Sequence, residues 1–341
     1  MPYTTIKKPS DYFNTKLYTP DGSSSFAVTG VGFQPDLVWV KSRNYTEDNQ
    51  LNDSVRGATK GLQSNLTNAE TTQANGLTSF DSDGFTVGNL SDYNFNGDSL
   101  VSWNWLGANG TASNTDGSIT STVSANTTSG FSIVSYTGTG SNATVGHGLG
   151  VVPKMFIIKN RDDGTGHWRV YHSSVGPTKY GNLDGADTFA TASTPYNNTD
   201  PTSSVFSIGT DNRTNASGQN MIAYCFAEVK GFSKIGSYVG NGSTDGTFVY
   251  TGFKPAWVIQ KPIDVAQNWQ IHDTKRDGYN PKNDNLSSNN SNSEADNKFI
   301  DILSNGFKLR RSDVLNVSGD NYIYMAFAEE PLVGDNPATA R

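Results

Sequence analysis

The sequence has little cysteine and no long hydrophobic run. Cys225, inside the apolar run MIAYCF, is the only cysteine among 341 residues, so an intramolecular disulfide and a cysteine-based metal cluster are excluded. No stretch reaches the roughly 18 consecutive apolar residues of a membrane helix. The opening residues, MPYTTIKKPSDYF, contain no apolar segment that resembles a signal peptide. We therefore expect no membrane insertion and no export signal.

Charge and catalytic motifs are also scarce. Only 17% of residues are charged and the net charge is −7, with no basic block along the chain, so nucleic acid is not an expected partner. There is no Gly-x-Ser-x-Gly elbow, no His-Glu-x-x-His and no phosphate-cradling loop. We expect a protein that is not an enzyme, with no catalytic residues, no cofactor and no metal site.

What the sequence does contain is typical of a turn-rich β protein. Hydrophobic residues make up 34% and aromatic residues 11%, and the aromatic content argues against disorder. The apolar runs are short and rich in Val, Ile and aromatics, as in LVWV at 37–40 and WVI at 257–259. Turn formers such as PDG at 20–22 and SNG at 304–306 bound them. This pattern predicts strands rather than amphipathic helices.

Three stretches of the chain share the same plan. They read YFNTKLYTPDGSSSFAVTGVGFQPDLVWVK (12–41), GFSIVSYTGTGSNATVGHGLGVVPKMFIIK (130–159) and GFSKIGSYVGNGSTDGTFVYTGFKPAWVIQK (231–261). Each has a Tyr, a Pro 17 positions later and a Lys 6 positions after that: Tyr18, Pro35 and Lys41; Tyr136, Pro153 and Lys159; Tyr238, Pro255 and Lys261. Such fixed spacing predicts one structural scaffold repeated three times.

A second pattern closes each repeat. Phe85, Phe206 and Phe307 are each followed 20 positions later by an aromatic residue, namely Trp105, Phe226 and Phe327. We interpret 1–106, 130–229 and 230–341 as three β repeats of about 90–100 residues, an ordinary domain size. Residues 107–129 are rich in Gly, Ser, Thr and Asn and are expected to form a flexible linker or extended arm. The predicted fold is all-β, with three tandem sandwich-like repeats that carry long loops.

Two groups of polar residues could carry chemistry. His172 in WRVYH and His272 in WQIHD, the latter beside Asp273, could act as acids or bases, but recurrence in two repeats favours a scaffold role. Asp273 and Glu294 are candidate acids for glycan cleavage, although nothing in the sequence places two carboxylates across a groove.

Paired aspartates raise the question of calcium. Asp81 with Asp83 and Asp162 with Asp163 lie where hairpin turns are expected, and neither pair continues into a full calcium loop with its distal Glu. The turn interpretation is favoured.

Aromatic residues are the better indication of binding. Trp39, Trp103, Trp105 and Trp257 lie inside strand runs and are expected in the core. Trp168 and Trp269 come after polar loops, RDDGTGHW and DVAQNW. They are therefore candidates for exposed contacts to a sugar or a partner protein.

The motifs taken together resemble a known group of proteins. The combination of YTGTGS with a Pro, an apolar strand and a Lys, as in GFQPDLVWVKSRN, VVPKMFIIKNRD and GFKPAWVIQKPID, resembles a repeated domain of virion proteins from marine bacteriophages of cyanophage and pelagiphage type. The closing segments GQNMIAYCFAEVKGFSKIGSY and GDNYIYMAFAEEP are similar to the same proteins, so the resemblance covers nearly the whole chain. It implies a structural part of a phage particle.

The first repeat departs from this pattern, with VSWNWLG where the others have the AYCFAE type. We interpret it as a candidate virion-docking unit, from which the linker projects the other two repeats.

These observations lead to three expected functions. The first is a non-enzymatic virion protein, a tail-associated fibre or appendage component that takes part in host attachment. The alternatives are a capsid decoration or head-appendage protein and a carbohydrate-binding module. Expected partners are other virion proteins, a host surface glycan or receptor, and further copies of the chain in a homo-oligomer. The expected location is the virion, after assembly in the host cytoplasm.

Overall fold

The computed structural model describes residues 4–331, and strands dominate it, which confirms the all-β prediction. Its helices are single turns: η1 (Pro9–Asp11), α1 (Ser91–Asn94) and α2 (Asn212–Asn215). Within residues 4–331 no helix is long and apolar enough to cross a membrane.

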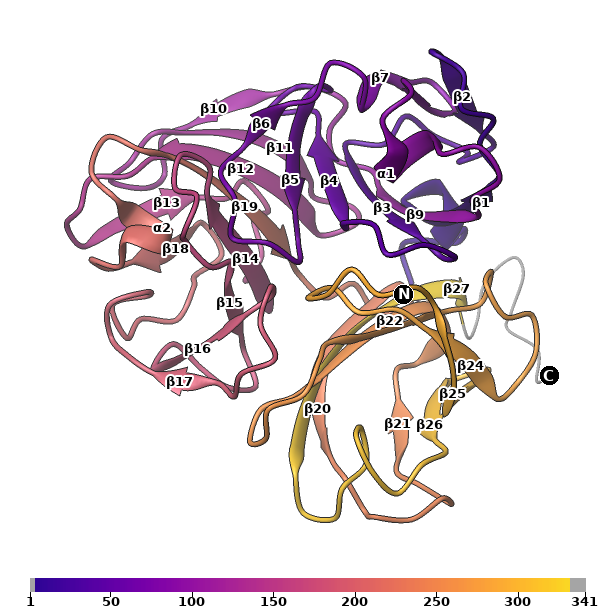
Figure 1. Cartoon of the computed structure of the whole chain (residues 1–341). Coiled ribbons are helices and arrows are strands. Elements are labelled where there is room, and N and C mark those ends of the chain that lie inside the picture. The colour runs from indigo at the N-terminus through magenta and orange to yellow at the C-terminus, as the bar shows by residue number, and fades with distance from the viewer. Residues whose placement is uncertain (1–3, 332–341) are drawn as a thin grey trace.

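The strands form three lobes around a common centre (Figure 1). In the first lobe the larger sheet has the order β1 (Phe13–Tyr18), β9 (Leu100–Trp105), β3 (Leu37–Ser42), β4 (Gln50–Asp53), β5 (Lys60–Gln63), β6 (Thr71–Thr72). Its smaller sheet has the order β2 (Phe26–Thr29), β8 (Gly84–Val87), β7 (Leu77–Asp81).

The second lobe has a larger sheet and a strand pair. The sheet has the order β10 (Ala112–Asn114), β11 (Ser121–Asn126), β12 (Phe131–Thr137), β19 (Asn220–Phe226), β14 (Met155–Asn160), β15 (Arg169–His172), β16 (Lys179–Asn182), β17 (Ala190–Thr191). The pair consists of β13 (Ala143–Gly146) and β18 (Val205–Ile208).

The third lobe has two sheets of four strands. One has the order β20 (Ser233–Val239), β27 (Asn321–Pro331), β22 (Phe253–Pro262), β23 (Gln270–Asp273). The other has the order β21 (Phe248–Tyr250), β26 (Gly306–Leu309), β25 (Ala295–Leu303), β24 (Lys282–Asn285). All the strand pairings in these sheets are antiparallel.

In each lobe the sheet that contains the closing strand (β9, β19 or β27) is buried on both faces at its central strands. In β3, Leu37 and Trp39 point into a core shared by the three lobes, whereas Val38 and Val40 point into the first lobe's own core. This explains why the run LVWVKS is apolar almost throughout instead of alternating with polar residues.

The shared core brings together the aromatic residues that close the three repeats. The ring centroids of Trp105, Phe226 and Phe327 form a triangle with sides of 6.3 Å, 5.8 Å and 6.1 Å. Within its own lobe, Trp105 is paired with Leu37 of β3, Phe226 with Met155 of β14 and Phe327 with Trp257 of β22. Aromatic pairs at these separations contribute about 1 kcal/mol each beyond the area they bury. The lobes are therefore joined through their closing strands.

The expected linker is instead part of the second sheet. Residues 112–114 form β10 and residues 121–126 form β11, which pairs with β12 over residues 122–126. The interpretation of 107–129 as a flexible linker is therefore wrong, as is the idea that it projects the second and third repeats away from the first. Small residues such as those of STVSAN fit a strand that packs closely against a neighbouring backbone, so composition alone was misleading.

Candidate functional site

The three lysines of the repeat pattern connect each lobe to the lobe before it in a ring. The ammonium groups of Lys41, Lys159 and Lys261 are buried, and each donates hydrogen bonds to main-chain carbonyls. The acceptors in the preceding lobe are Ser291 for Lys41 (3.1 Å), Thr67 for Lys159 (2.8 Å) and Ala186 for Lys261 (3.1 Å). Burial lowers the pKa of each ammonium to about 8. The lysines therefore hold the lobes together and do not face a ligand.

The repeated Tyr and Pro residues act within each lobe. The hydroxyls of Tyr18, Tyr136 and Tyr238 donate to the main-chain oxygens of Tyr93, Thr214 and Leu315 at 3.0, 2.6 and 3.0 Å. Burial raises the pKa of all three hydroxyls well above the ordinary range. Pro35, Pro153 and Pro255 are also buried. The pattern therefore marks scaffold positions.

Main-chain hydrogen bonds close the ring of lobes. The N–H of Glu70 donates to the carbonyl of Arg161 (2.7 Å), that of Phe189 to Ile263 (3.1 Å), and that of Glu294 to Arg43 (2.7 Å). These three bonds run from the first lobe to the second, from the second to the third, and from the third to the first. Each lobe thus contacts both others.

Two of these interfaces carry partly buried ion-pair networks. Between the first and second lobes the Glu70 carboxylate accepts from Arg161 at 2.8 Å and from Arg56 at 3.1 Å. Between the third and first lobes the Glu294 carboxylate accepts from Arg43 at 2.6 Å and from Arg276 at 2.8 Å. Pairing of this kind compensates for the cost of burying charge.

The interface between the second and third lobes is apolar at the same positions. Val175 stands where the other lobes have Arg56 and Arg276, and Phe189 and Ile263 take the places of the Glu and the outer Arg. His172, opposite Met155 as Asp53 is opposite Leu37, approaches the carbonyl of Tyr324 in the third lobe at 3.3 Å. Burial lowers the pKa of His172 to about 4, so it is neutral near pH 7.

The prediction that Trp168 and Trp269 are exposed is wrong. Trp168 is 0% exposed and Trp269 is 1% exposed. Each indole N–H donates to a carbonyl of the preceding lobe, Trp168 to Gln63 at 2.9 Å and Trp269 to Asn182 at 2.8 Å. Their polar flanking loops misled the prediction, because the surface that covers each ring belongs to another lobe.

The candidate acids of the third repeat also lie in an interface, whereas His272 contacts the ring of Phe299 inside the third lobe. The structure brings Asp273 and Glu294 together through Arg276, which donates to both at 2.6 and 2.8 Å. Burial alone would raise their pKa values, but Arg276 and, for Glu294, Arg43 hold both below the ordinary range. Burial, with the charge of Arg276, lowers the pKa of His272 to about 3. These groups are ion-paired or neutral.

The aspartates considered for calcium lie in turns. The Asp83 carboxylate accepts from the N–H groups of Gly30 and Gly32 at 2.9 and 2.7 Å, and Asp163 accepts from the N–H of Thr165 at 2.8 Å. Within the described part of the chain, no three His, Cys, Asp or Glu side chains gather in a way that could hold a metal ion.

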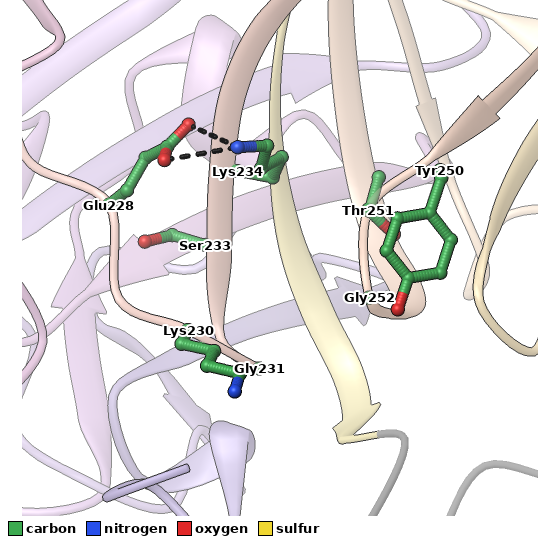
Figure 2. Close-up of a pocket in the computed structure, with 8 residues that line it drawn as sticks. All are labelled: Glu228, Lys230, Gly231, Ser233, Lys234, Tyr250, Thr251 and Gly252. Atoms are coloured by element: carbon green, nitrogen blue, oxygen red, sulfur yellow. Dashed lines mark hydrogen bonds and ion pairs between the residues drawn. The ribbon is translucent and has the colours of Figure 1, made fainter. Parts of the chain in front are cut away.

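An open pocket on the third lobe is the strongest candidate for a binding site (Figure 2). It has a volume of about 570 Å³ and lies between the start of β20 and the residues that end and come after β21. Glu228 and Lys234 form an ion pair of 3.1 Å on one side, and the Tyr250 ring stands on the other. That side chain is 55% exposed.

Tyr250 belongs to a surface that sequence reasoning missed. β21 alternates, with Phe248 and Tyr250 exposed and Val249 buried between them. The matching positions of the other lobes carry Ala27 and Thr29, and Thr144 and Gly146. The alternation of FVY was the available signal, because large aromatics on the outward face of a strand in only one repeat indicate a role special to that repeat.

Comparison with known proteins gives a family. Searches of curated proteins and of solved structures found no match. A family model described as a domain of unknown function (DUF7483) matches residues 8–331, a single span that includes all three lobes. The chain therefore belongs to the DUF7483 family.

Proposed function

We propose that this chain is a structural protein of a bacteriophage particle, a tail-associated fibre or appendage component that takes part in attachment. The sequence resemblance to marine phage virion proteins supports this proposal. The observation that carries it is how the polar residues are used: Asp273, Glu294, His172 and the repeated lysines make hydrogen bonds across interfaces between lobes. They build a rigid scaffold.

The outer surface of this scaffold is where partners would bind. Exposed aromatic residues gather on β21, and the pocket beside β20 opens next to them. A particle component of this kind makes its contacts through such edges and loops, while its core supplies rigidity. Because Trp168 and Trp269 are buried, any glycan contact belongs to this outer surface instead.

Gold labelling of purified particles tests the proposal. An antibody raised against residues 231–341 is applied to intact particles, which are viewed by electron microscopy and analysed by mass spectrometry. Label on the tail or its fibres is the expected result. Label over the head would replace tail attachment by capsid decoration. Particles that lack the protein by both methods would refute the proposal.

A further inference from the structure

The edge of β20 corresponds to an edge that the second lobe covers with its own chain. β12 and β20 hold the same place, since each pairs with the closing strand of its lobe, β19 or β27. The far edge of β12 is paired with β11, Thr122 opposite Ser135 and Ser124 opposite Ile133. β20, in contrast, is the last strand of its sheet within residues 4–331.

The pocket beside β20 is the open counterpart of the space that β11 fills. In the second lobe β11 packs against the residues just after β13. A Cβ added at Gly148 would lie 3.1 Å from the Cβ of Ala125 and 3.3 Å from a methyl carbon of Val123. The hydroxyl of Ser121 donates to the carbonyl of Gly146 at 2.7 Å. In the third lobe the pocket is bounded on one side by β20 and on the other by Thr251 and Gly252. These two residues follow β21 as Gly148 follows β13.

Backbone groups along β20 are oriented to receive a strand. The N–H of Gly240 donates to the carbonyl of Asp320, and the N–H of Ala328 donates to the carbonyl of Phe232. In this register the even-numbered residues of β20 exchange main-chain hydrogen bonds with β27. The N–H groups of Ile235 and Ser237 therefore point outward. The N–H of Ile235 donates to the Glu228 carboxylate at 2.9 Å. The carboxylate oxygen thus takes the place that a main-chain carbonyl of an added strand would have. In the second lobe the residue at that place is Ser124, opposite Ile133.

Tyr250 marks a difference from the position that faces the arm of the second lobe. Its counterpart is Gly146, where an added Cβ would come within 1.6 Å of the Asn114 side-chain oxygen on β10. With a side chain at this position, an arm placed as in the second lobe would have to move the Asn114 side chain. The third lobe has an exposed aromatic ring there, beside an open slot.

We propose that the β20 edge is the acceptor site for an extended segment of another polypeptide, which adds to the sheet as an antiparallel strand. Main-chain hydrogen bonds supply affinity in this mode, and side chains at alternate positions supply specificity. With β11 as the template, the segment carries small apolar side chains where Val123 and Ala125 stand and displaces the Glu228 carboxylate from Ile235. The inference does not depend on a role in a phage particle.

The competing explanation is that Glu228 and Lys234 simply protect a bare edge. Charged side chains on edge strands commonly prevent unwanted pairing. The two explanations differ in the expected effect of removing the Glu228 carboxylate. An acceptor site should then bind a matching strand more tightly. An edge that is only protected should show no specific binding of such a strand.

A peptide titration separates them. The probe is a labelled synthetic peptide of residues 118–127, SITSTVSANT, titrated into the full-length protein while anisotropy and amide exchange are followed. We expect binding with new protection of the Ser237 amide. Ser237→Pro, which removes the outward N–H, should weaken binding about tenfold. Ser237→Ala, which keeps it, should not. Glu228→Ala should bind more tightly, and thermal unfolding checks that each variant is folded.

Several results would overturn the inference. These are the absence of new protection along β20 with peptide up to about 1 mM, the range of very weak binding, and binding that Ser237→Pro leaves unchanged. Loss of protection in β12 would mean that the peptide replaces β11. Self-association that Ser237→Pro abolishes would make the occupant a second copy, and a saccharide that perturbs only Tyr250 would make the pocket a sugar site.

Discussion

Buried indole N–H groups make hydrogen bonds between the lobes of this protein. Trp39, Trp168 and Trp269 are all buried indoles, yet they differ in what their N–H groups contact. Trp168 and Trp269 donate to the neighbouring lobe, whereas the Nε1 of Trp39 has no hydrogen-bond partner among the described residues. The comparison separates the contribution of the hydrogen bond from that of the buried ring.

Trp168→Phe should therefore destabilise the protein through the lost hydrogen bond. The ring is largely replaced, but the carbonyls of Gln63 and Leu66 lose their donor. We expect the free energy of unfolding to fall by about 2–3 kcal/mol, part of it from the smaller ring. Urea titration followed by fluorescence measures this loss. Trp39→Phe is the matched control and should cost clearly less; equal losses would contradict the account.

Glu70 should make the stability of the first interface depend on pH in the acid range. Burial by itself raises its pKa, but the hydrogen bond from Arg161 and the charge of Arg56 outweigh this and hold the pKa below its ordinary value of 4.5. The unfolded state then binds a proton more readily than the folded state. The stabilisation is complete above about pH 4.5 and is lost as the pH falls through the folded pKa.

Denaturant titrations between about pH 6 and pH 3, on either side of the ordinary carboxyl pKa, test this expectation. Glu70→Gln should be less stable than the wild type at pH 6, and the difference should shrink towards pH 3. Glu330→Gln, which removes another half-buried carboxylate near the end of β27, is measured alongside it as the control variant. A constant difference across the range would show that Glu70 is not an ionised partner in the folded protein.

At the scale of elements, β12 and β20 allow a direct comparison between a strand that has a neighbour on its outer side and an equivalent strand at the edge of its sheet. Ser135 and Ser237 occupy the same place in the two strands, but Ser135 faces Thr122 of β11 and Ser237 faces no strand on its outer side among the described residues. In the isolated protein the Ser135 amide should exchange at least about tenfold more slowly than the Ser237 amide, because exchange depends on local opening. Nuclear magnetic resonance resolves both. Equal protection would mean that the β20 edge is covered.

The elements also show how far sequence reasoning reaches. The spacing of Tyr18, Pro35 and Lys41 and its two recurrences predicted scaffold positions, because local turn and strand geometry repeats with the sequence. It did not predict that each lysine reaches the preceding lobe, since that contact depends on how lobes meet. The burial of Trp168 was missed for the same reason, because its carbonyl partner belongs to the preceding lobe. The pairing of 122–126 with 131–135 is local in the chain and was missed because the Ser, Thr and Asn content was interpreted as a linker.

The candidate site was predictable only in part. The acids Asp273 and Glu294 were recognised as candidates, but their joint contact with Arg276 requires the fold of the loop between β23 and β24. The pocket beside β20 leaves almost no trace in the sequence. Its boundaries come from a missing neighbour strand, and only the exposed Phe248 and Tyr250 indicate it.

At the scale of the whole molecule, the three lobes form one unit around the shared core. Residues of all three lobes enter one hydrophobic cluster, and the triangle of Trp105, Phe226 and Phe327 lies within it. A lobe removed from the other two would expose one face of the sheet that contains its closing strand. Such a lobe should therefore not be stable alone.

Differential scanning calorimetry of the full-length chain tests this claim most directly. The account predicts one cooperative transition, with a ratio of calorimetric to van't Hoff enthalpy of about 1. Residues 107–229, which include β10 and β11 and so make up the whole second lobe, should show no cooperative transition when expressed alone. Two or three separate transitions in the full chain, or an isolated second lobe that melts at the temperature of the whole protein, would contradict it and would show independent domains.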